Sequence, residues 1–334
     1  MGKPNIVTFC VRGFPGTNRS LMNLEKTARL SRHFVLASSS QDTPEIKFFI
    51  NYLKTERPKL LVFGGWSAIY EIFLTSLKKE KIRFGMYWTS SPGQVDISEE
   101  VDILPFLIKD SRIKHRLFAN REFALSLSGH VGNVDYLPDT LVLPLPNRKT
   151  GDKREKNMII SLFCSPFEYK RKNILNALLA ISMLKSDYLL YLNGLSKNKY
   201  YKSFLESLNI RYKDFGWMAE KKYQDTLEAI DLGLQVSFAE TFNHVVAEHI
   251  LRGVPVITSH MVPVMDNMPN SIKKRLIVDV ADNPLRIKEK IEFLANHPEA
   301  RIELGQKALA SLRKENEKNI RIAKKVLRSI TNSI

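Results

Sequence analysis

The sequence predicts an α/β protein with two doubly wound domains, each a parallel sheet covered by helices. Three observations support this prediction. Short apolar runs rich in β-branched residues alternate with segments of helical length along most of the chain. A length of 334 residues is enough for two domains of ordinary size. A polar stretch, PLPNRKTGDKREK from Pro144, interrupts the alternation once, and a second series of strands and helices follows it.

The first domain is expected at residues 1–147. Its strands are predicted at residues 5–11, 33–37, 59–63 and 82–88. These runs are continuously apolar, which is typical of parallel strands that are buried on both faces. The first helix is expected to begin at Asn18 or Ser20, since either residue can cap it. Further helices are predicted at residues 44–55 and 66–79, and only looser segments from there to Leu143.

A linker is expected at residues 148–157, and the second domain at residues 158–310. The strands of this domain are predicted at residues 158–164, 188–193, 212–216, 232–237, 254–259 and 276–280. Its helices are predicted at residues 171–184, 197–208, 220–230 and 242–252. The last segment, residues 311–334, has one apolar stripe among basic residues, which predicts a C-terminal helix suited to packing back on the first domain.

Composition narrows the classes of protein. Two cysteines, Cys10 and Cys164, cannot build a multi-bridge disulfide framework or a cysteine-rich zinc site. The first residues lack the apolar core of a signal peptide, and the most apolar window, residues 60–77, contains two glycines and a glutamate. We therefore expect a cytoplasmic protein. The net charge of +16 is spread over both halves and favours anionic partners, among which nucleic acid, acidic lipid and anionic glycan stay open.

The most informative segment reads SFAETFNHVVAEH, from Ser237 to His249. Glu240 follows an expected strand at the mouth of a helix, and Glu248 comes eight positions later. Eight residues are slightly more than two helical turns, so both carboxylates can face one side. The backbone amides that open the helix favour an anion or a polar sugar oxygen above them. Sugars and riboses offer paired hydroxyls to such carboxylates, but two glutamates at this spacing indicate nothing by themselves, since most such pairs lie on a solvated helix face.

The whole string resembles the retaining nucleotide-sugar glycosyltransferases of GT-B type, the glycosyl transferases group 1, whose hallmark is two glutamates separated by seven residues. The matching residues are Ser237, Glu240, Phe242, Glu248, Gly253, Pro255, Val256 and Ile257. Val236, Asn243 and His249 stand where this family usually has Pro, Gly and Ala. Asn is the least awkward substitute for that glycine, because it enters left-handed conformations readily. The resemblance implies two Rossmann-like domains that face a cleft, an N-terminal acceptor domain and a C-terminal nucleotide-sugar domain.

The resemblance also implies roles for individual residues. Glu240 would hold hydroxyls of the donor sugar and Glu248 the ribose, while Thr241, Phe242 and Asn243 would present backbone groups to the sugar.

Basic residues are expected to hold the donor diphosphate. Lys172, in a Lys-Asn pair before a helix, would neutralise the charge on the departing diphosphate. The arginine that the family carries at the preceding strand end is missing, so Lys170 or Arg171 would supply the second cation. Weaker similarities place Gly216 and Trp217 near the nucleobase, and a glycine loop that includes Gly16 near the diphosphate.

The implied activity is transfer of a sugar from a nucleoside diphosphate sugar to an acceptor hydroxyl, with retention at the anomeric carbon, as in glycan biosynthesis. The sequence contains no Asp-x-Asp metal motif, Walker loop or dinucleotide fingerprint, so we expect neither a metal nor a cofactor besides the donor. A lipid-linked acceptor, with peripheral contact to the inner membrane face, stays open. So do two other functions: a nucleic-acid binder or modifier, suggested by the charge, and an inactive relative that binds a sugar nucleotide without transferring it.

Overall fold

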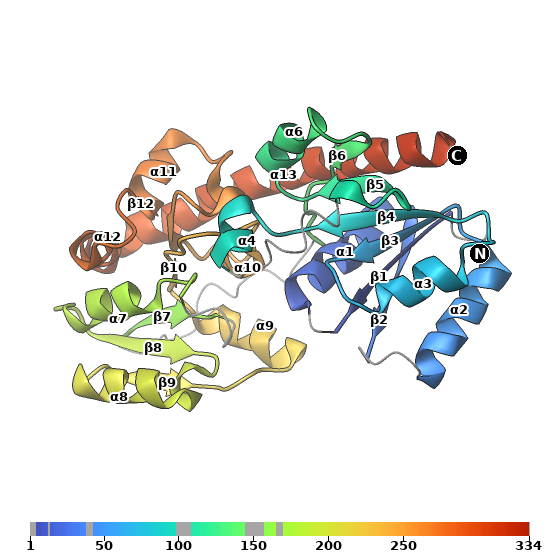
Figure 1. Cartoon of the computed structure of the whole chain (residues 1–334). Helices are drawn as coiled ribbons and strands as arrows, with labels where there is room; N and C mark the ends of the chain where they lie inside the picture. The colour runs from blue at the N-terminus through green and yellow to red at the C-terminus, as the bar shows by residue number, and fades with distance from the viewer. Residues whose placement is uncertain are drawn as a thin grey trace. The chain divides into compact units, whose positions relative to one another are not determined.

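The computed structural model describes residues 5–12, 14–37, 43–97, 108–143, 157–164 and 170–333. The chain divides into two compact units: unit 1 contains residues 1–143 and 316–334, and unit 2 contains residues 144–315. Each unit holds one six-stranded sheet flanked by helices (Figure 1). The predicted α/β class with two parallel sheets is confirmed. Apart from residue 157, the expected linker at 148–157 lies outside the described residues.

The sheet of unit 1 has the strand order β2-β1-β3-β4-β5-β6, and all neighbouring strands are parallel. Its strands are β1 (Ile6–Val11), β2 (Ser31–Leu36), β3 (Leu60–Gly64), β4 (Arg83–Trp88), β5 (Ile113–Phe118) and β6 (Val134–Tyr136). Its helices include α1 (Pro15–Ala28), α2 (Pro44–Glu56), α3 (Tyr70–Ser76), α4 (Pro92–Ile97) and α6 (Arg121–Ser128). Strands β1 and β3 are buried along their whole length, which explains why they read as continuous apolar runs.

Helix α1 begins earlier than the sequence predicted. Pro15 is its first residue, since the fixed φ of proline suits the first helical position and its missing N–H costs nothing there. Asn18 and Ser20, the expected caps, therefore lie inside the helix. The Asn18 side chain donates to the carbonyl of Val11 at 3.2 Å, and the Ser20 hydroxyl donates to the carbonyl of Gly16 at 3.2 Å.

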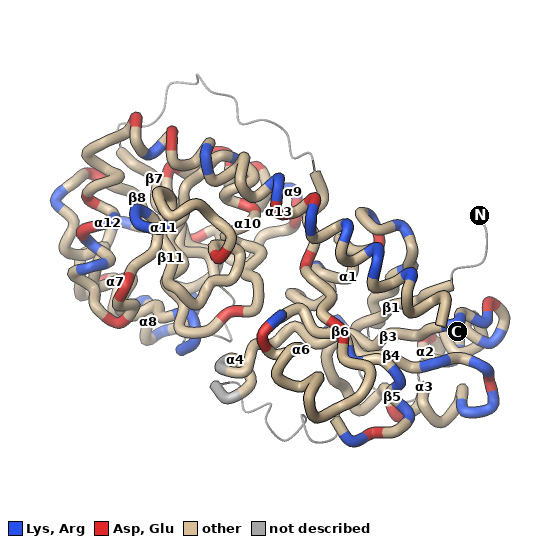
Figure 2. Tube along the Cα trace, turned by 90° about the horizontal axis from the view of Figure 1, so that it is seen from above, with Lys and Arg blue, Asp and Glu red and all other residues tan. Residues whose placement is uncertain are grey.

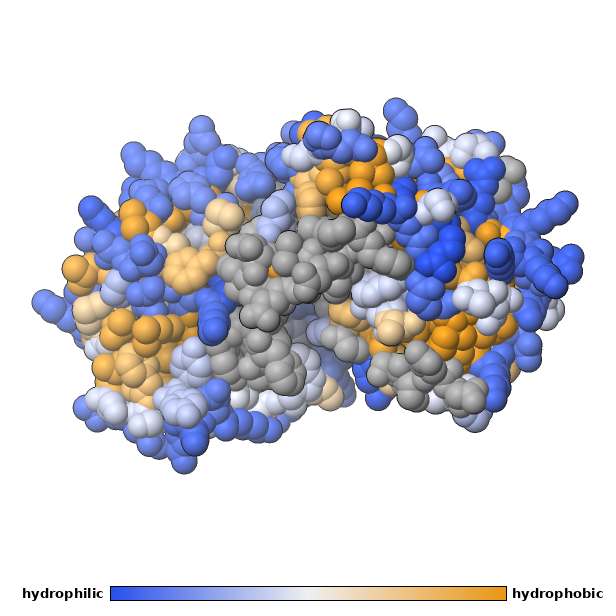
Figure 3. All heavy atoms as spheres, viewed as in Figure 1, coloured by the Kyte–Doolittle hydropathy of each residue, from blue (hydrophilic) through white to orange (hydrophobic). Residues whose placement is uncertain are grey.

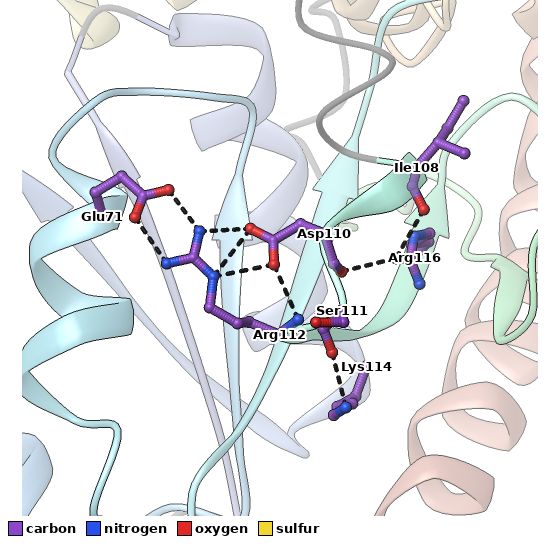
Figure 4. A network of polar contacts seen from close by, with 7 residues as sticks. All are labelled: Glu71, Ile108, Asp110, Ser111, Arg112, Lys114 and Arg116. Carbon is purple, nitrogen blue, oxygen red and sulfur yellow. Dashed lines mark hydrogen bonds and ion pairs between the residues drawn. The ribbon is translucent and has the colours of Figure 1, made fainter.

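Strands β5 and β6 and helix α6 occupy a region where the sequence predicted only loose segments. Strand β5 contains a buried arginine, Arg116, which obscures its apolar character. The Arg116 guanidinium donates to the carbonyls of Ile108 and Asp110, both at 3.0 Å. These hydrogen bonds offset the cost of burying the arginine. Nearby, Arg112 lies between the carboxylates of Glu71 on α3 and Asp110 (Figure 4), which fixes the entry to β5.

The long helix α13 (Pro298–Asn332), red in Figure 1, begins before the expected start at residue 311. Its residues up to 315 belong to unit 2 and those from 316 to unit 1. Within unit 1, Ala323, Leu327 and Ile330 join a buried cluster that contains residues of β1, α1 and β3. The Asn316 side chain bonds both backbone groups of Leu141, at 2.7 and 2.9 Å.

The sheet of unit 2 has the strand order β12-β11-β10-β7-β8-β9, again entirely parallel. Its strands are β7 (Met158–Leu162), β8 (Tyr188–Leu192), β9 (Tyr212–Asp214), β10 (Leu232–Gln235), β11 (Val256–Ser259) and β12 (Ile277–Val278). Its helices include α7 (Ile174–Ser182), α8 (Lys199–Ser207), α9 (Glu220–Ala229), α10 (His244–Ile250), α11 (Asn270–Leu276) and α12 (Pro284–Asn296). Helices α7 and α10 begin three and two residues later than predicted, so Lys172 lies in the loop before α7, and Glu240 precedes α10 as expected.

The surface carries the charge that the composition predicts. Lys and Arg residues occur on elements of both units (Figure 2), and hydrophilic side chains surround separate apolar patches on the face in Figure 3. No helix within the described ranges combines the length and apolar content that a membrane crossing requires.

Candidate functional site

Unit 2 contains a topological switch point between β7 and β10. The chain proceeds from β7 to β8 and β9 on one side, and then returns to place β10 and β11 on the other side of β7. In open parallel sheets, ligands bind in the crevice outside the carboxyl ends of the strands at such a point. The segments that follow these two strands carry Lys172 and Glu240, so the topology brings residues 68 positions apart to one place.

Glu240 forms a buried ion-pair cluster with two cations. Its Oε1 accepts a hydrogen bond from Nζ of Lys172 at 2.5 Å, and its Oε2 lies 2.8 Å from Nη1 of Arg171. The three residues are 6%, 8% and 4% exposed, respectively. Burial raises the pKa of Glu240, but the charges of Lys172 and Arg171 outweigh burial and hold that pKa below its ordinary value. The carboxylate is therefore ionised, and these three side chains together carry one excess positive charge.

The two loops of the cluster are fixed to each other by further contacts. Nη1 of Arg171 donates to the carbonyl of Ala239 at 2.7 Å, and the amide of Phe238 donates to the carbonyl of Arg171 at 2.8 Å. Asn173, in the left-handed conformation with φ 55°, donates to the carbonyls of Val236 and Ala281 at 3.0 and 2.6 Å. These bonds hold Lys172 against Glu240 because both flanking residues are anchored.

Asn243 holds Glu240 from the other side. It adopts φ 69°, a left-handed conformation that glycine accepts most readily. Its Oδ1 accepts from the amide of Val246 at 3.2 Å and caps α10, while its Nδ2 donates to Oε1 of Glu240 at 3.1 Å. The sequence predicted a backbone role for Asn243, and these two side-chain contacts were not predicted.

Glu248 lies on α10 and is 7% exposed. Helix α10 begins at His244, so the helix fixes the position of Glu248. Glu240 precedes the helix, and its cations and Asn243 hold it instead. Thr241 and Phe242 lie half-buried between Glu240 and α10. The ring of Phe242 contacts that of His244, with centroids 5.2 Å apart.

The remaining predicted residues lie further along the chain or in unit 1. Lys170 is exposed, in contrast to its neighbour Arg171. Gly216 and Trp217 follow β9, at the same carboxyl edge of the sheet, and Trp217 is 65% exposed. Gly16 lies in the first turn of α1 in unit 1, and a Cβ there would have no neighbour within 4 Å.

His249 is a buried neutral histidine beside the site. Its Nδ1 lies 2.7 Å from the carbonyl of Val245, and its Nε2 lies 2.7 Å from the hydroxyl of Ser161 on β7. Burial lowers the pKa of His249 to about 4. It therefore joins α10 to the sheet as an uncharged group. Among the described residues, no group of three or more His, Cys, Asp or Glu side chains is placed to hold a metal ion.

Comparisons with known proteins define the class of this fold. Residues 147–311, which fall within unit 2, match the family model of glycosyl transferases group 1. No curated protein matches the chain significantly. Among solved structures, sucrose-phosphate synthase from Thermosynechococcus elongatus is similar with a TM-score of 0.76 and 12% identity, over 99% of this chain and 100% of that one.

Two other solved structures are similar over their whole length. Anabaena HepE, in complex with UDP and glucose, has a TM-score of 0.72 and 12% identity, over 98% of this chain and 99% of that one. A glycosyltransferase from Rickettsia africae has a TM-score of 0.68 and 13% identity, over 100% of this chain and 99% of that one. At such identities the similarity defines the fold, which is of GT-B type.

Proposed function

We propose that this protein is a metal-independent, retaining glycosyltransferase that moves a sugar from a nucleoside diphosphate sugar to an acceptor hydroxyl. One observation carries the proposal: Glu240 is buried in ion pairs with Lys172 and Arg171 at the switch point of unit 2. This cluster lies inside the segment that matches the glycosyl transferases group 1 model. A fold alone would not identify the reaction, since one fold serves many chemistries.

The cluster is suited to a departing diphosphate. When the glycosidic bond to the donor breaks, negative charge develops on the phosphate oxygens, and fixed cations stabilise it. An ammonium group has three N–H donors. Among the described residues Lys172 donates to Glu240, so it has further donors to offer to phosphate oxygens. Lys172 and Arg171 thus supply positive charge that a metal ion would supply in other phosphate sites. Arg171, rather than exposed Lys170, is the second cation.

Donor binding would exchange the partners of Lys172. Oε1 of Glu240 already accepts from Lys172 and Asn243, which leaves little capacity for a sugar hydroxyl. In our proposal the diphosphate draws Lys172 toward itself, and hydroxyls of the donor sugar take its place on Glu240. Arg171 stays, because it also bonds the carbonyl of Ala239. Glu248 would bind the ribose, and the backbone of residues 241–243 would contact the sugar.

This arrangement favours substitution on one face of the sugar without a covalent intermediate. A carboxylate whose oxygens are held by two cations and an amide is a weak nucleophile. The leaving phosphate would accept the proton of the acceptor hydroxyl. HepE was solved with UDP-glucose, with a TM-score of 0.71 and 12% identity to this chain, which supports a hexosyltransferase-like reaction with UDP-glucose as the first donor to test.

The test is turnover of UDP-glucose, GDP-glucose and ADP-glucose, measured as transfer or hydrolysis. We expect Glu240→Gln and Lys172→Ala to lower kcat/KM about 10²- to 10³-fold for the donor that the wild type uses, as losses of transition-state stabilisation do. Lys202→Ala, an exposed lysine on α8, is the control and should turn over normally. Turnover like that of the wild type in both site variants would refute the assignment. Donor binding without turnover by the wild type would identify an inactive relative.

A further inference from the structure

One carboxylate, that of Asp214, joins the loops that follow β8 and β9. Its Oδ1 accepts from the backbone amides of Gly194 at 2.5 Å and Gly216 at 2.9 Å. Its Oδ2 accepts from the backbone amide and the hydroxyl of Ser196, both at 2.7 Å. Gly194 and Ser196 follow β8, whereas Gly216 follows β9. A single side chain therefore receives four hydrogen bonds from two loops.

The same loops are in close contact through their backbones. Gly194 has φ 111° and Gly216 has φ 66°, conformations that favour glycine. A Cβ on Gly194 would lie 3.8 Å from the backbone of Gly216 and of Trp217, so the loops touch. Asn193 Oδ1 also accepts from the amide of Cys164, at 2.9 Å, beyond the end of β7. The ends of three adjacent strands are thus joined at the edge that carries the candidate site.

Trp217 extends outward from this fixed backbone. Its side chain is 65% exposed, although tryptophans are buried on average. An exposed indole on a rigid loop offers a flat apolar face, and nucleobases stack on such faces with little regard to their identity. Trp66 and Trp88, the other two tryptophans, lie in unit 1 and contribute to its apolar core.

We propose that Asp214 is a positioning residue for the nucleobase of the donor. It holds the two loops so that Trp217 stacks on the base, and it acts through Trp217 without touching the nucleotide. This inference rests on the proposed function, since it names the part of that site which meets the base.

A carboxylate is the group that this position requires. All four bonds come from donors, and a carboxylate accepts at both oxygens. Burial raises the pKa of Asp214, but hydrogen bonds from Ser196, Gly216 and Gly194 outweigh burial and hold that pKa below its ordinary value. In Asp214→Asn, the new NH2 group faces either the two donors of Ser196 or the backbone amides of Gly194 and Gly216. An NH2 group cannot accept hydrogen bonds from these donors. The variant keeps the shape of the side chain and loses half of its acceptor capacity.

The test is calorimetric titration of the full chain with UDP, GDP, ADP and inorganic pyrophosphate, the last as a probe without a base. The wild type should bind at least one nucleoside diphosphate more tightly than pyrophosphate. Trp217→Ala should weaken that nucleotide about tenfold, a typical loss for one stacked base, and leave pyrophosphate unchanged. Asp214→Asn should do the same. The double variant should lose no more than Trp217→Ala alone, because both changes remove one interaction.

Tyr200→Ala is the matched control, because Tyr200 is 74% exposed on the same unit but outside the two loops. If Asp214→Asn does not fold, Ser196→Ala removes only the hydroxyl bond and should give a smaller loss that also disappears in the Trp217→Ala background. Additive losses, or equal weakening of pyrophosphate, would overturn the role of Asp214 and leave the proposed function intact. A wild type that prefers no nucleotide over pyrophosphate would overturn both.

Discussion

Glu240 and Asp214 are two carboxylates at one edge of the unit 2 sheet, and different partners hold each of them. Both have a pKa below the ordinary value although burial opposes it. Glu240 owes this to the side-chain cations Lys172 and Arg171, whereas Asp214 owes it to backbone amides and a hydroxyl. Long cationic side chains can change partners when a ligand arrives, but amides move only with their loop. We infer that the first cluster exchanges partners with substrate and the second fixes the backbone around it.

The largest expected effect separates Arg171, which is paired with Glu240, from its exposed neighbour Lys170. Arg171→Ala leaves a buried carboxylate with only one charged partner, and breaking such a pair should lower the free energy of unfolding by about 3 kcal/mol. Lys170→Ala should change it by less than about 0.5 kcal/mol, because Lys170 is exposed. Chemical denaturation of both variants measures the difference. A larger loss in Lys170→Ala would contradict the ion pair between Arg171 and Glu240 as the source of the stability.

His249 is a buried titratable group without an oppositely charged partner, and it can be compared with the two carboxylates Glu240 and Asp214. His249 has a pKa of about 4 in the folded protein, against about 6.5 for an unperturbed histidine. As the pH falls through this window the unfolded chain gains a proton that the folded chain does not bind, so stability falls, by about 3 kcal/mol in total.

Denaturation between pH 7 and pH 4 tests this expectation. His33 has the same direction of pKa shift and the same value in unit 1, so the comparison must isolate His249. His249→Ala should be less stable than the wild type at pH 7 but should lose less stability toward pH 4. An identical pH dependence in variant and wild type would contradict the account.

The smallest effect concerns Asn243. Asn243→Ala should destabilise the protein by about 2 kcal/mol, since Ala adopts the left-handed conformation poorly and cannot cap α10. Asn243→Gly should cost less than about 0.5 kcal/mol, because glycine accepts the conformation and is a tolerable N-cap. Thermal unfolding of the two variants measures the difference, and equal losses would mean that the left-handed backbone conformation does not determine the choice of residue.

The sequence predicted the regular elements best where burial is purely apolar. Strands β1, β3 and β4 appear within about a residue of their expected positions because both of their faces are covered. Strand β5 was missed because a buried arginine interrupts its pattern, and its carbonyl partners at residues 108 and 110 cannot be read from local periodicity. Helix α12 was also missed, although Asn283 and Pro284 form an ordinary start signal.

The candidate site was predictable in its residue types but not in its contacts. The family resemblance singled out Glu240 and Lys172, whose roles stay predictions. Their direct ion pair depends on strand order, since β7 and β10 become neighbours only through the sheet topology. The side-chain contacts of Asn243 and Asp214 were missed for the same reason. Amide and carboxylate side chains act through whatever donors the fold brings to them, and those lie on other loops.

The affinity for UDP tests the exchange of Lys172 most directly. If Glu240 holds Lys172 in the free protein, Glu240→Gln should release the ammonium group and remove a nearby negative charge. UDP should then bind about tenfold more tightly, a change of about 1.4 kcal/mol, while kcat/KM for sugar transfer falls about 10²- to 10³-fold. Lys172→Ala should weaken UDP. Unchanged UDP affinity in both variants would contradict the account.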